Sequence, residues 1–124
     1  MLDTHAWFWW LAEPGKLSRR ATRTIAAARV VGVSSYTVLE LADLVERRRI
    51  ELDRPTRSWI RAAVAQDRTR LLQLDAEIAV DAAQLQFARD PFDRVIYATA
   101  RAADAPLVTR DERLHAFDAA RAVW

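Results

Sequence analysis

The sequence predicts an α/β fold: a three-layer α/β/α domain with a mostly parallel central sheet. Two observations support this prediction. Short apolar runs typical of buried strands alternate with longer segments of helical periodicity. Polar helix-start residues directly follow several of these runs, as they do in βα units. The 124 residues are enough for one core, so we expect a single domain over residues 1–124.

The first part of the chain reads as a very short strand followed by two helices. Met1 and Leu2 form the end of the strand, and Asp3 or Thr4 can cap the next helix. Ser18 starts the second helix, which carries an apolar stripe on one side. The expected elements are a helix over 5–12, a turn over 13–16 and a helix over 18–29.

The middle of the chain repeats the pattern of a strand followed by helices. Residues 30–34 form a continuous apolar run, which is typical of a buried strand. A helix over 35–48 follows, with Leu41 in its apolar stripe. Residues 50–52 fit either an extended piece or a helix end, and Pro55 opens another helix.

The last part predicts two further strand and helix pairs and a final edge strand. Asp75 and Asp90 stand where helix N-caps are expected. The expected elements are a strand over 71–74, a helix from Asp75 through Leu85, a helix from Asp90 to about Ala103, a strand over 106–109, a helix over 111–117 and a strand over 122–124.

Composition narrows the class of protein. Apolar residues make up 52% of the chain and charged residues 29%, which indicates a globular domain rather than a disordered one. The absence of cysteine excludes disulfides and thiolate metal sites and fits a reducing compartment. No apolar run approaches the roughly 18 residues of a membrane helix, and no basic residue precedes the first apolar run as in a signal peptide. We therefore expect a cytoplasmic protein.

The stretch from Asp90 to Asp93 is predicted to open a buried helix with two carboxylates on its first turn. Asp90 fits the N-cap position and Pro91 the first helical position. Both aspartates can be explained as caps alone. Because Asp90 suffices as the cap, Asp93 is the better candidate for a functional group.

Three other acids stand near the ends of expected strands. Asp3 follows the first strand, Glu40 lies on the second turn of the helix after residues 30–34, and Asp111 comes two residues after a strand. Ligands of open parallel sheets bind beyond the carboxyl ends of the strands. With Asp93, these acids would converge on one rim and repel one another unless a cation lay between them. Such oxygen ligands suit Mg²⁺ or Mn²⁺, which indicates metal-assisted phosphodiester hydrolysis.

Each acid also has a purely structural interpretation. Asp3 can serve only as a helix cap, and Glu40 can pair with Arg47 or Arg48 on its own helix. Thr109 and Glu112 have the spacing of a capping box, which would leave Asp111 spare.

Other site types lack support in the sequence. His5 and His115 are too few and too distant to indicate a zinc site, and no glycine-rich phosphate loop is present. The row from Trp7 to Trp10 cannot face one core on a 3.6-residue period, so part of it must meet solvent, another helix or a partner.

Four segments together resemble the PIN-domain ribonucleases, and in particular the VapC-type toxins of VapBC toxin–antitoxin systems. The resemblance covers essentially the whole chain, and its motifs are specific in combination rather than singly. The segments are Leu2-Asp3-Thr4-His5-Ala6, Leu39-Glu40-Leu41-Ala42, Asp90-Pro91-Phe92-Asp93-Arg94 and Leu107-Val108-Thr109-Arg110-Asp111.

This resemblance implies a PIN fold and a Mg²⁺- or Mn²⁺-dependent endoribonuclease. The four family acids match Asp3, Glu40, Asp93 and Asp111, which would be both catalytic residues and metal ligands. Thr4 and Thr109 match supporting hydroxyls, and Asp90 is a supporting polar residue. The family usually has several apolar residues before its first aspartate, whereas here only Met1 and Leu2 precede it.

The resemblance also implies partners. They are an RNA substrate, a cognate VapB-type antitoxin whose tail lies in a groove beside the active site, and a second copy of the chain in a homodimer. Trp7, Trp9 and Trp10 are the residues that we place at the antitoxin groove.

Two other functions remain possible from the sequence. A regulatory module could bind antitoxin or nucleic acid without catalysis. An aspartate-based phosphotransfer protein would also carry acids at strand ends, but Asp3-Thr4-His5 lacks a second aspartate two residues on, and no strand-end lysine is present.

Overall fold

The computed structural model describes residues 1–124 and contains a central sheet of parallel strands. Leu2 pairs in parallel with both Val33 and Val108, and it joins two pairs of strands into one sheet. Across the sheet the order is β2 (Thr69–Leu72), β1 (Val31–Ser34), Leu2, β3 (Leu107–Val108) and β4 (Ala122–Val123). The predicted parallel sheet is confirmed.

Leu2 holds the centre of this sheet although it is the only residue of its strand. Its N–H donates to the Gly32 carbonyl at 3.0 Å, and the Asp3 N–H donates to the Val108 carbonyl at 3.1 Å. The Val108 N–H in turn donates to the Met1 carbonyl at 2.9 Å. Hydrogen bonds on both sides therefore fix the position of Asp3 at the end of this strand.

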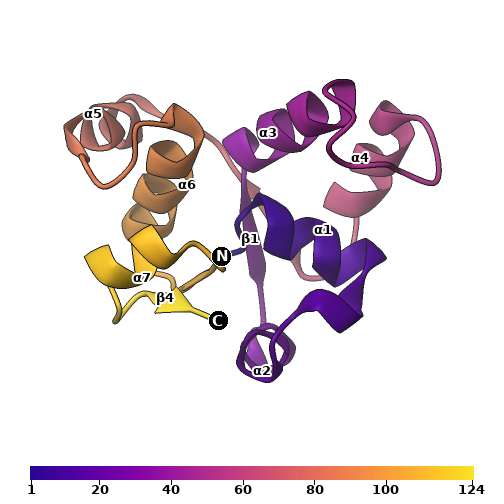
Figure 1. Cartoon of the computed structure of the whole chain (residues 1–124), viewed down its shortest axis with the longest axis horizontal. Helices are drawn as coiled ribbons and strands as arrows, with labels where there is room; N and C mark the ends of the chain where they lie inside the picture. Colours follow the sequence, from indigo (N-terminus) through magenta and orange to yellow (C-terminus); the bar gives the residue numbers. More distant parts are fainter.

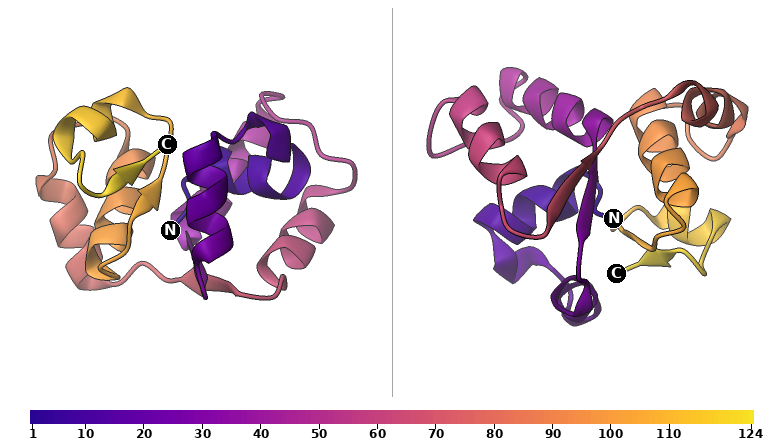
Figure 2. Two further views of the ribbon diagram at one scale, coloured as in Figure 1. Left: turned by 90° about the horizontal axis from the view of Figure 1, so that it is seen from below. Right: turned by 180° about the vertical axis from the view of Figure 1, so that it is seen from behind.

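Helices cover both faces of the sheet. Figure 1 shows β1 between α1, α3 and α4 on one side and α5, α6 and α7 on the other. Figure 2 shows the chain crossing between the two sides through β2 and the segment before α5. The helices are α1 (Thr4–Ala12), a 3₁₀ helix η1 (Pro14–Lys16), α2 (Arg19–Ala27), α3 (Ser35–Glu46), α4 (Thr56–Val64), α5 (Ala76–Gln84), α6 (Pro91–Ala102) and α7 (Glu112–Phe117).

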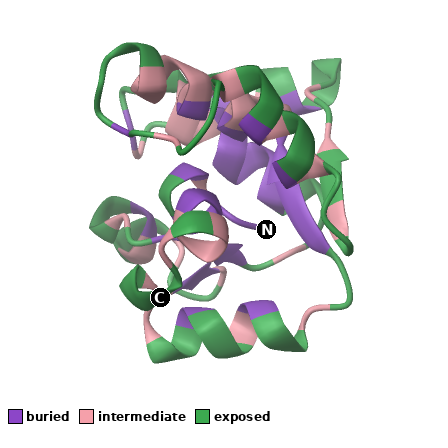
Figure 3. Ribbon diagram, turned by 90° about the vertical axis from the view of Figure 1, so that its right-hand side faces the viewer, coloured by how far each residue is buried: buried purple, intermediate pink, exposed green.

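The core consists of two apolar clusters, one on each side of the sheet. One cluster joins α1, α2, α3 and α4, and the other joins α5, α6 and α7. The strands β1, β3 and β4 are buried, whereas β2 at the edge of the sheet is partly exposed, and the helices expose their outer sides (Figure 3). This is the three-layer arrangement that the sequence predicts. No helix has the length and apolar character needed to span a membrane.

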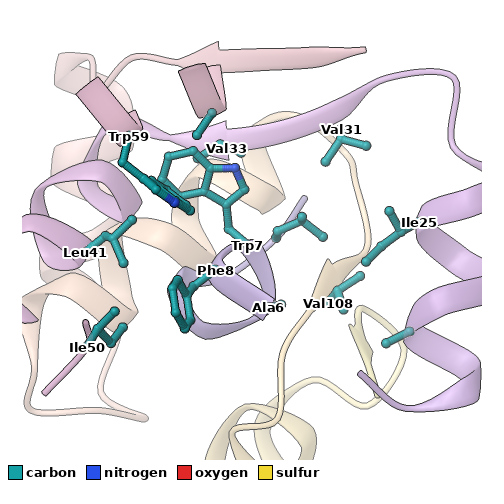
Figure 4. Packing of buried hydrophobic residues seen from close by; sticks show 13 residues of the cluster. Ala6, Trp7, Phe8, Ile25, Val31, Val33, Leu41, Ile50, Trp59 and Val108 are labelled. Atoms are coloured by element: carbon teal, nitrogen blue, oxygen red, sulfur yellow. The ribbon is translucent and has the colours of Figure 1, made fainter. Parts of the chain in front are cut away.

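Trp7 lies at the centre of the first cluster. Its indole is 0% exposed and meets the Trp59 ring edge to face, with ring centroids 5.6 Å apart. Figure 4 shows both rings beside Phe8 and Leu41. The prediction that Trp7 contributes to a partner groove is therefore wrong, because the sheet and α4 already cover its side chain.

Several predicted boundaries move by two residues. The strand predicted over 71–74 lies at Thr69–Leu72, in register with β1 so that Val31 pairs with Thr69. The helix predicted to reach Arg48 ends at Glu46, because Arg48 adopts a left-handed φ of 55°. In α1, α2, α5 and α6, a carboxylate or hydroxyl oxygen of the N-cap residue accepts a hydrogen bond from a free backbone N–H of the first turn, as predicted.

Candidate active site

A cavity of about 520 Å³ opens at the carboxyl ends of the central strands, and we call it the acidic cavity. Asp3 follows Leu2 directly, and Thr109 follows β3, so both lie at this edge of the sheet. Glu40 reaches the cavity from α3, and Asp93 reaches it from the first turn of α6. The structure thus brings to one cavity the acids Asp3, Glu40, Asp93 and Asp111.

Asp3 combines a structural and a cavity-lining role. Its Oδ1 accepts a hydrogen bond from the Ala6 N–H at 2.7 Å and caps α1. Burial raises the pKa of Asp3 above its ordinary value, while hydrogen bonds from Thr109 and Ala6 oppose the rise. The side chain is therefore held rigidly where a negative charge is costly.

Glu40 lies on the second turn of α3 with no cation beside it. The Thr4 hydroxyl donates a hydrogen bond to its Oε2 atom. Burial raises the pKa of Glu40 to about 7, and the charges of Asp93 and Asp3 add to the rise. The alternative pairing with Arg47 or Arg48 is wrong, because Arg47 pairs with Asp43 at 2.8 Å instead.

Asp93 and Asp111 share one guanidinium group. An Nη2–H of Arg113 donates to Asp93 at 2.7 Å, and the same residue binds Asp111 through both Nε and Nη2. Burial still raises the pKa of Asp93 despite this cation. Burial would also raise the pKa of Asp111, but the hydrogen bonds from Arg113 outweigh it and lower that pKa.

Asp111 caps the short helix α7 itself. Its Oδ1 accepts from the Arg113 N–H at 2.9 Å, and the Thr109 hydroxyl oxygen accepts from the Asp111 N–H at 3.0 Å. The predicted capping box of Thr109 with Glu112 is wrong, because α7 begins at Glu112 and Asp111, two residues after Thr109, takes the cap position. Asp111 is therefore a fixed wall of the acidic cavity rather than a spare carboxylate.

The predicted supporting residues separate into two groups. Thr4 and Thr109 are buried, line the cavity and hydrogen-bond to the acids Glu40 and Asp3. Asp90 is exposed and caps α6 by accepting from the Phe92 N–H at 2.9 Å. Its charge contributes to the raised pKa of Glu40 but its side chain is not part of the cavity lining.

The donor atoms of the cavity fit a hard divalent cation in their chemistry. The four acids and the two threonines offer carboxylate and hydroxyl oxygens, which Mg²⁺ and Mn²⁺ prefer. Burial raises the pKa of three of these acids, and the nearby positive charge does not offset this effect; the three acids are Asp3, Glu40 and Asp93. As arranged, no three His, Cys, Asp or Glu side chains are close enough to hold a metal ion together. Binding of a metal ion would therefore require the acidic side chains to move closer together.

Two cavity residues could not be recognised from the sequence as part of the site. Arg113 is one of many arginines, and only its contact with Asp93, 20 residues away, distinguishes it. His5 lines the cavity, whereas His115 binds the Thr109 carbonyl at 2.9 Å, so the two histidines have separate roles. Of the other aromatic residues on α1, Trp9 lines the cavity and Trp10 packs half-buried against the core.

The fold and this cavity define a class: parallel-sheet α/β/α domains with a cluster of acids at the carboxyl ends of the strands. Comparison with known proteins identifies the family. Residues 1–120 match the PIN domain, and the chain belongs to the PIN-domain family.

Similar proteins come from Mycobacterium tuberculosis. The chain is 39% identical to ribonuclease VapC22 over 116 residues, which cover 92% of this chain and 88% of that protein. The fold matches the crystal structure of VapC20, described as a toxin that cleaves the sarcin–ricin loop, with a TM-score of 0.62 at 20% identity. That match covers 94% of this chain and 92% of the other. The predicted family and fold are confirmed.

Proposed function

We propose that this protein is a divalent-metal-dependent endoribonuclease that serves as the toxin of a toxin–antitoxin pair. The observation that carries the proposal is that Asp3, Glu40, Asp93 and Asp111, from four separate segments, line one cavity. Membership of the PIN-domain family and the 39% identity to a VapC ribonuclease support the same activity.

The four acids would hold Mg²⁺ or Mn²⁺. When bound, the metal supplies charge stabilisation and a water of lowered pKa for attack on an RNA phosphodiester. Asp3 and Asp111 are fixed in place because each caps a helix. Thr4 orients Glu40 through its hydroxyl, and Thr109 does the same for Asp3.

Arg113 has a place in this function besides its ion pairs. In the structure its guanidinium neutralises Asp93 and Asp111. A bound metal would take over that neutralisation and free the guanidinium. Arginine binds phosphate well because its planar fork can make two hydrogen bonds. Arg113 and the exposed Arg110 are therefore the residues that we expect to contact the RNA phosphate at this cavity.

The proposal extends to partners and location. We propose a VapB-type antitoxin as inhibitor, a homodimer as the assembled toxin, and the cytoplasm as its compartment. Trp9 and Trp10 remain the candidates for antitoxin contact on α1, since both are partly exposed. The non-catalytic and phosphotransfer alternatives are less well supported, because the relative with 39% identity is a ribonuclease.

RNA cleavage by the purified protein tests the proposal. Wild-type protein should cleave single-stranded RNA internally in Mg²⁺ or Mn²⁺ and stop when EDTA is added. Asp93→Asn should lose at least about 100-fold of the rate, because a ligand charge is removed. Asp81→Asn is the matched control, since Asp81 pairs with Arg101 at 2.8 Å on α5, outside the cavity. Cleavage that survives EDTA and Asp93→Asn would overturn the assignment.

A further inference from the structure

A second cavity adjoins the acidic cavity, and we call it the adjoining cavity. It measures about 260 Å³ and lies beside α1 and the segment after α3. The two cavities share two lining side chains, His5 and Trp9. These two aromatic rings therefore form the boundary between the acids and the adjoining cavity.

The two rings form one aromatic surface on α1. His5 and Trp9 are four residues apart, so they stand one above the other on the same face of the helix. Their ring centroids are 5.5 Å apart, and Trp9 also lies 5.6 Å from the Trp124 ring. His5 is exposed, and Trp9 and Trp124 are partly exposed.

The helix that carries this surface is rigidly anchored. Trp7, on the opposite face of α1, and Phe8, a buried residue that also lines the adjoining cavity, pack against Trp59 in the first core cluster. Asp3 caps the start of the same helix. The aromatic surface and the first acid are thus held on one fixed element, so their separation does not depend on a loop.

Positive charge flanks the aromatic surface on both sides. Arg110 lines the acidic cavity and Arg49 lines the adjoining cavity, and neither makes an ion pair with an acid. Lys16 also lines the adjoining cavity and pairs with Glu13 at 2.6 Å, which neutralises that acid. A second acid, Glu51, lies there as well. The two rings therefore lie between two cavities that each contain one arginine outside any ion pair.

We propose that His5 and Trp9 form a stacking platform for one unpaired base of the RNA substrate, next to the phosphate that is cleaved. Arg49 then contacts a phosphate further along the strand. This inference rests on the proposed ribonuclease function. The alternation of aromatic rings and cations matches single-stranded RNA, whose bases stack on aromatic side chains while its phosphates bind cations.

Binding to RNA with and without bases tests the platform. The protein carries Asp93→Asn so that the RNA stays intact, and the probes are a single-stranded RNA decamer and an abasic chain of equal length. Trp9→Ala should weaken binding of the decamer about tenfold and change binding of the abasic chain less than twofold. Trp9→Phe should keep most of the affinity, because it keeps an aromatic ring.

Two control variants separate stacking from charge and from folding. Phe117→Ala, which removes an exposed aromatic ring outside both cavities, should leave the ratio of the two affinities unchanged. Arg49→Ala should weaken binding of both probes by the same factor and reduce the salt dependence of binding.

Equal losses on both probes after Trp9→Ala, or no loss on either, would overturn the platform. Loss of affinity for a cognate antitoxin with unchanged RNA binding would overturn it too and assign the surface to protein. Wild-type cleavage of RNA in Mn²⁺ is measured in parallel. If wild-type protein cleaves and Trp9→Ala binds normally, only the platform fails, whereas wild-type protein that neither cleaves nor binds RNA removes both proposals.

Discussion

The two walls of the acidic cavity surround their carboxylates differently. On the inner wall, Asp3 and Glu40 are near hydroxyls and no cation forms an ion pair with them, and burial raises the pKa of both. On the outer wall, Arg113 binds Asp93 and Asp111; the pKa of Asp111 is lowered, whereas burial still raises the pKa of the more buried Asp93. A cation supplied by the chain therefore lowers a carboxylate's pKa only where burial is slight enough for the cation to outweigh it.

This comparison explains how the protein can fold before it meets a metal. The outer wall carries its own counter-ion, which limits repulsion among the acids. The inner wall has hydrogen bonds from Thr4 and Thr109, and those bonds stabilise the charged forms only in part. The inner wall is therefore where a bound divalent ion should have the largest effect on stability.

The largest expected effect concerns Asp3, which caps a helix and lines the cavity. Asp75 offers a matched control, because it caps α5 by accepting from the Ile78 N–H at 2.8 Å, far from the acids. Both Asp3→Asn and Asp75→Asn should cost at most about 1 kcal/mol of stability, since asparagine also caps helices. Only Asp3→Asn should reduce RNA cleavage, by at least about 100-fold. Equal activities of the two variants would contradict the inner-wall role.

A smaller effect is expected for the stability of Glu40→Gln as pH changes. The pKa of Glu40 is about 7 in the folded state against an ordinary 4.5. The stability that the protonated Glu40 side chain contributes to the folded state is therefore fully present below pH 4.5 and is lost as pH rises through 7. Without metal, this shift corresponds to at most about 3 kcal/mol between pH 4.5 and pH 8. Solvent screening of the partly exposed side chain reduces the effect, so Glu40→Gln should gain about 2 kcal/mol relative to wild type over this range.

Denaturant unfolding in EDTA at several pH values measures this gain. Glu46→Gln, exposed on the same helix, is the control and should show no such trend. A difference between Glu40→Gln and wild type that stays constant with pH would show that the inner wall does not hold a costly charge.

The smallest effect is expected on the outer wall. Arg113→Gln removes the cation that competes with a metal for Asp93 and Asp111, so Mn²⁺ should bind about fivefold more tightly, which corresponds to about 1 kcal/mol. Arg101→Gln, which breaks the ion pair with Asp81 on the far side of α6, should leave Mn²⁺ affinity unchanged. Paramagnetic resonance of free Mn²⁺ measures both. Weaker binding by Arg113→Gln would mean that the guanidinium supports the metal site instead of competing with it.

The sequence predicted much of the fold because its signals are local. Caps such as Ser18 and Asp75 and the apolar run of residues 30–34 need no distant partner to be recognised. The predicted strand over 71–74 begins two residues too late, since β2 lies at Thr69–Leu72. Its position is set by pairing with β1, and hydrophobic periodicity does not reveal that pairing.

The candidate site was predictable in its acids but not in its cations. The acids stand near strand ends or in the first two turns of a helix, positions that the order of predicted elements indicates; they are Asp3, Glu40, Asp93 and Asp111. The role of Arg113 depends on a contact between α6 and α7. The burial of Trp7 depends on Trp59, 52 residues further along, so a row of four aromatics gave no sign of which one faces the core.

The central claim is our proposal that four carboxylates from separate segments together form a binding site for divalent metal. Calorimetric titration of the purified protein with Mn²⁺ tests it most directly, together with the double variant Asp3→Asn, Asp93→Asn. Wild-type protein should bind Mn²⁺ with millimolar or tighter affinity, and the double variant should give no binding heat. Absence of binding by wild-type protein at millimolar Mn²⁺, or unchanged binding by the double variant, would contradict the claim.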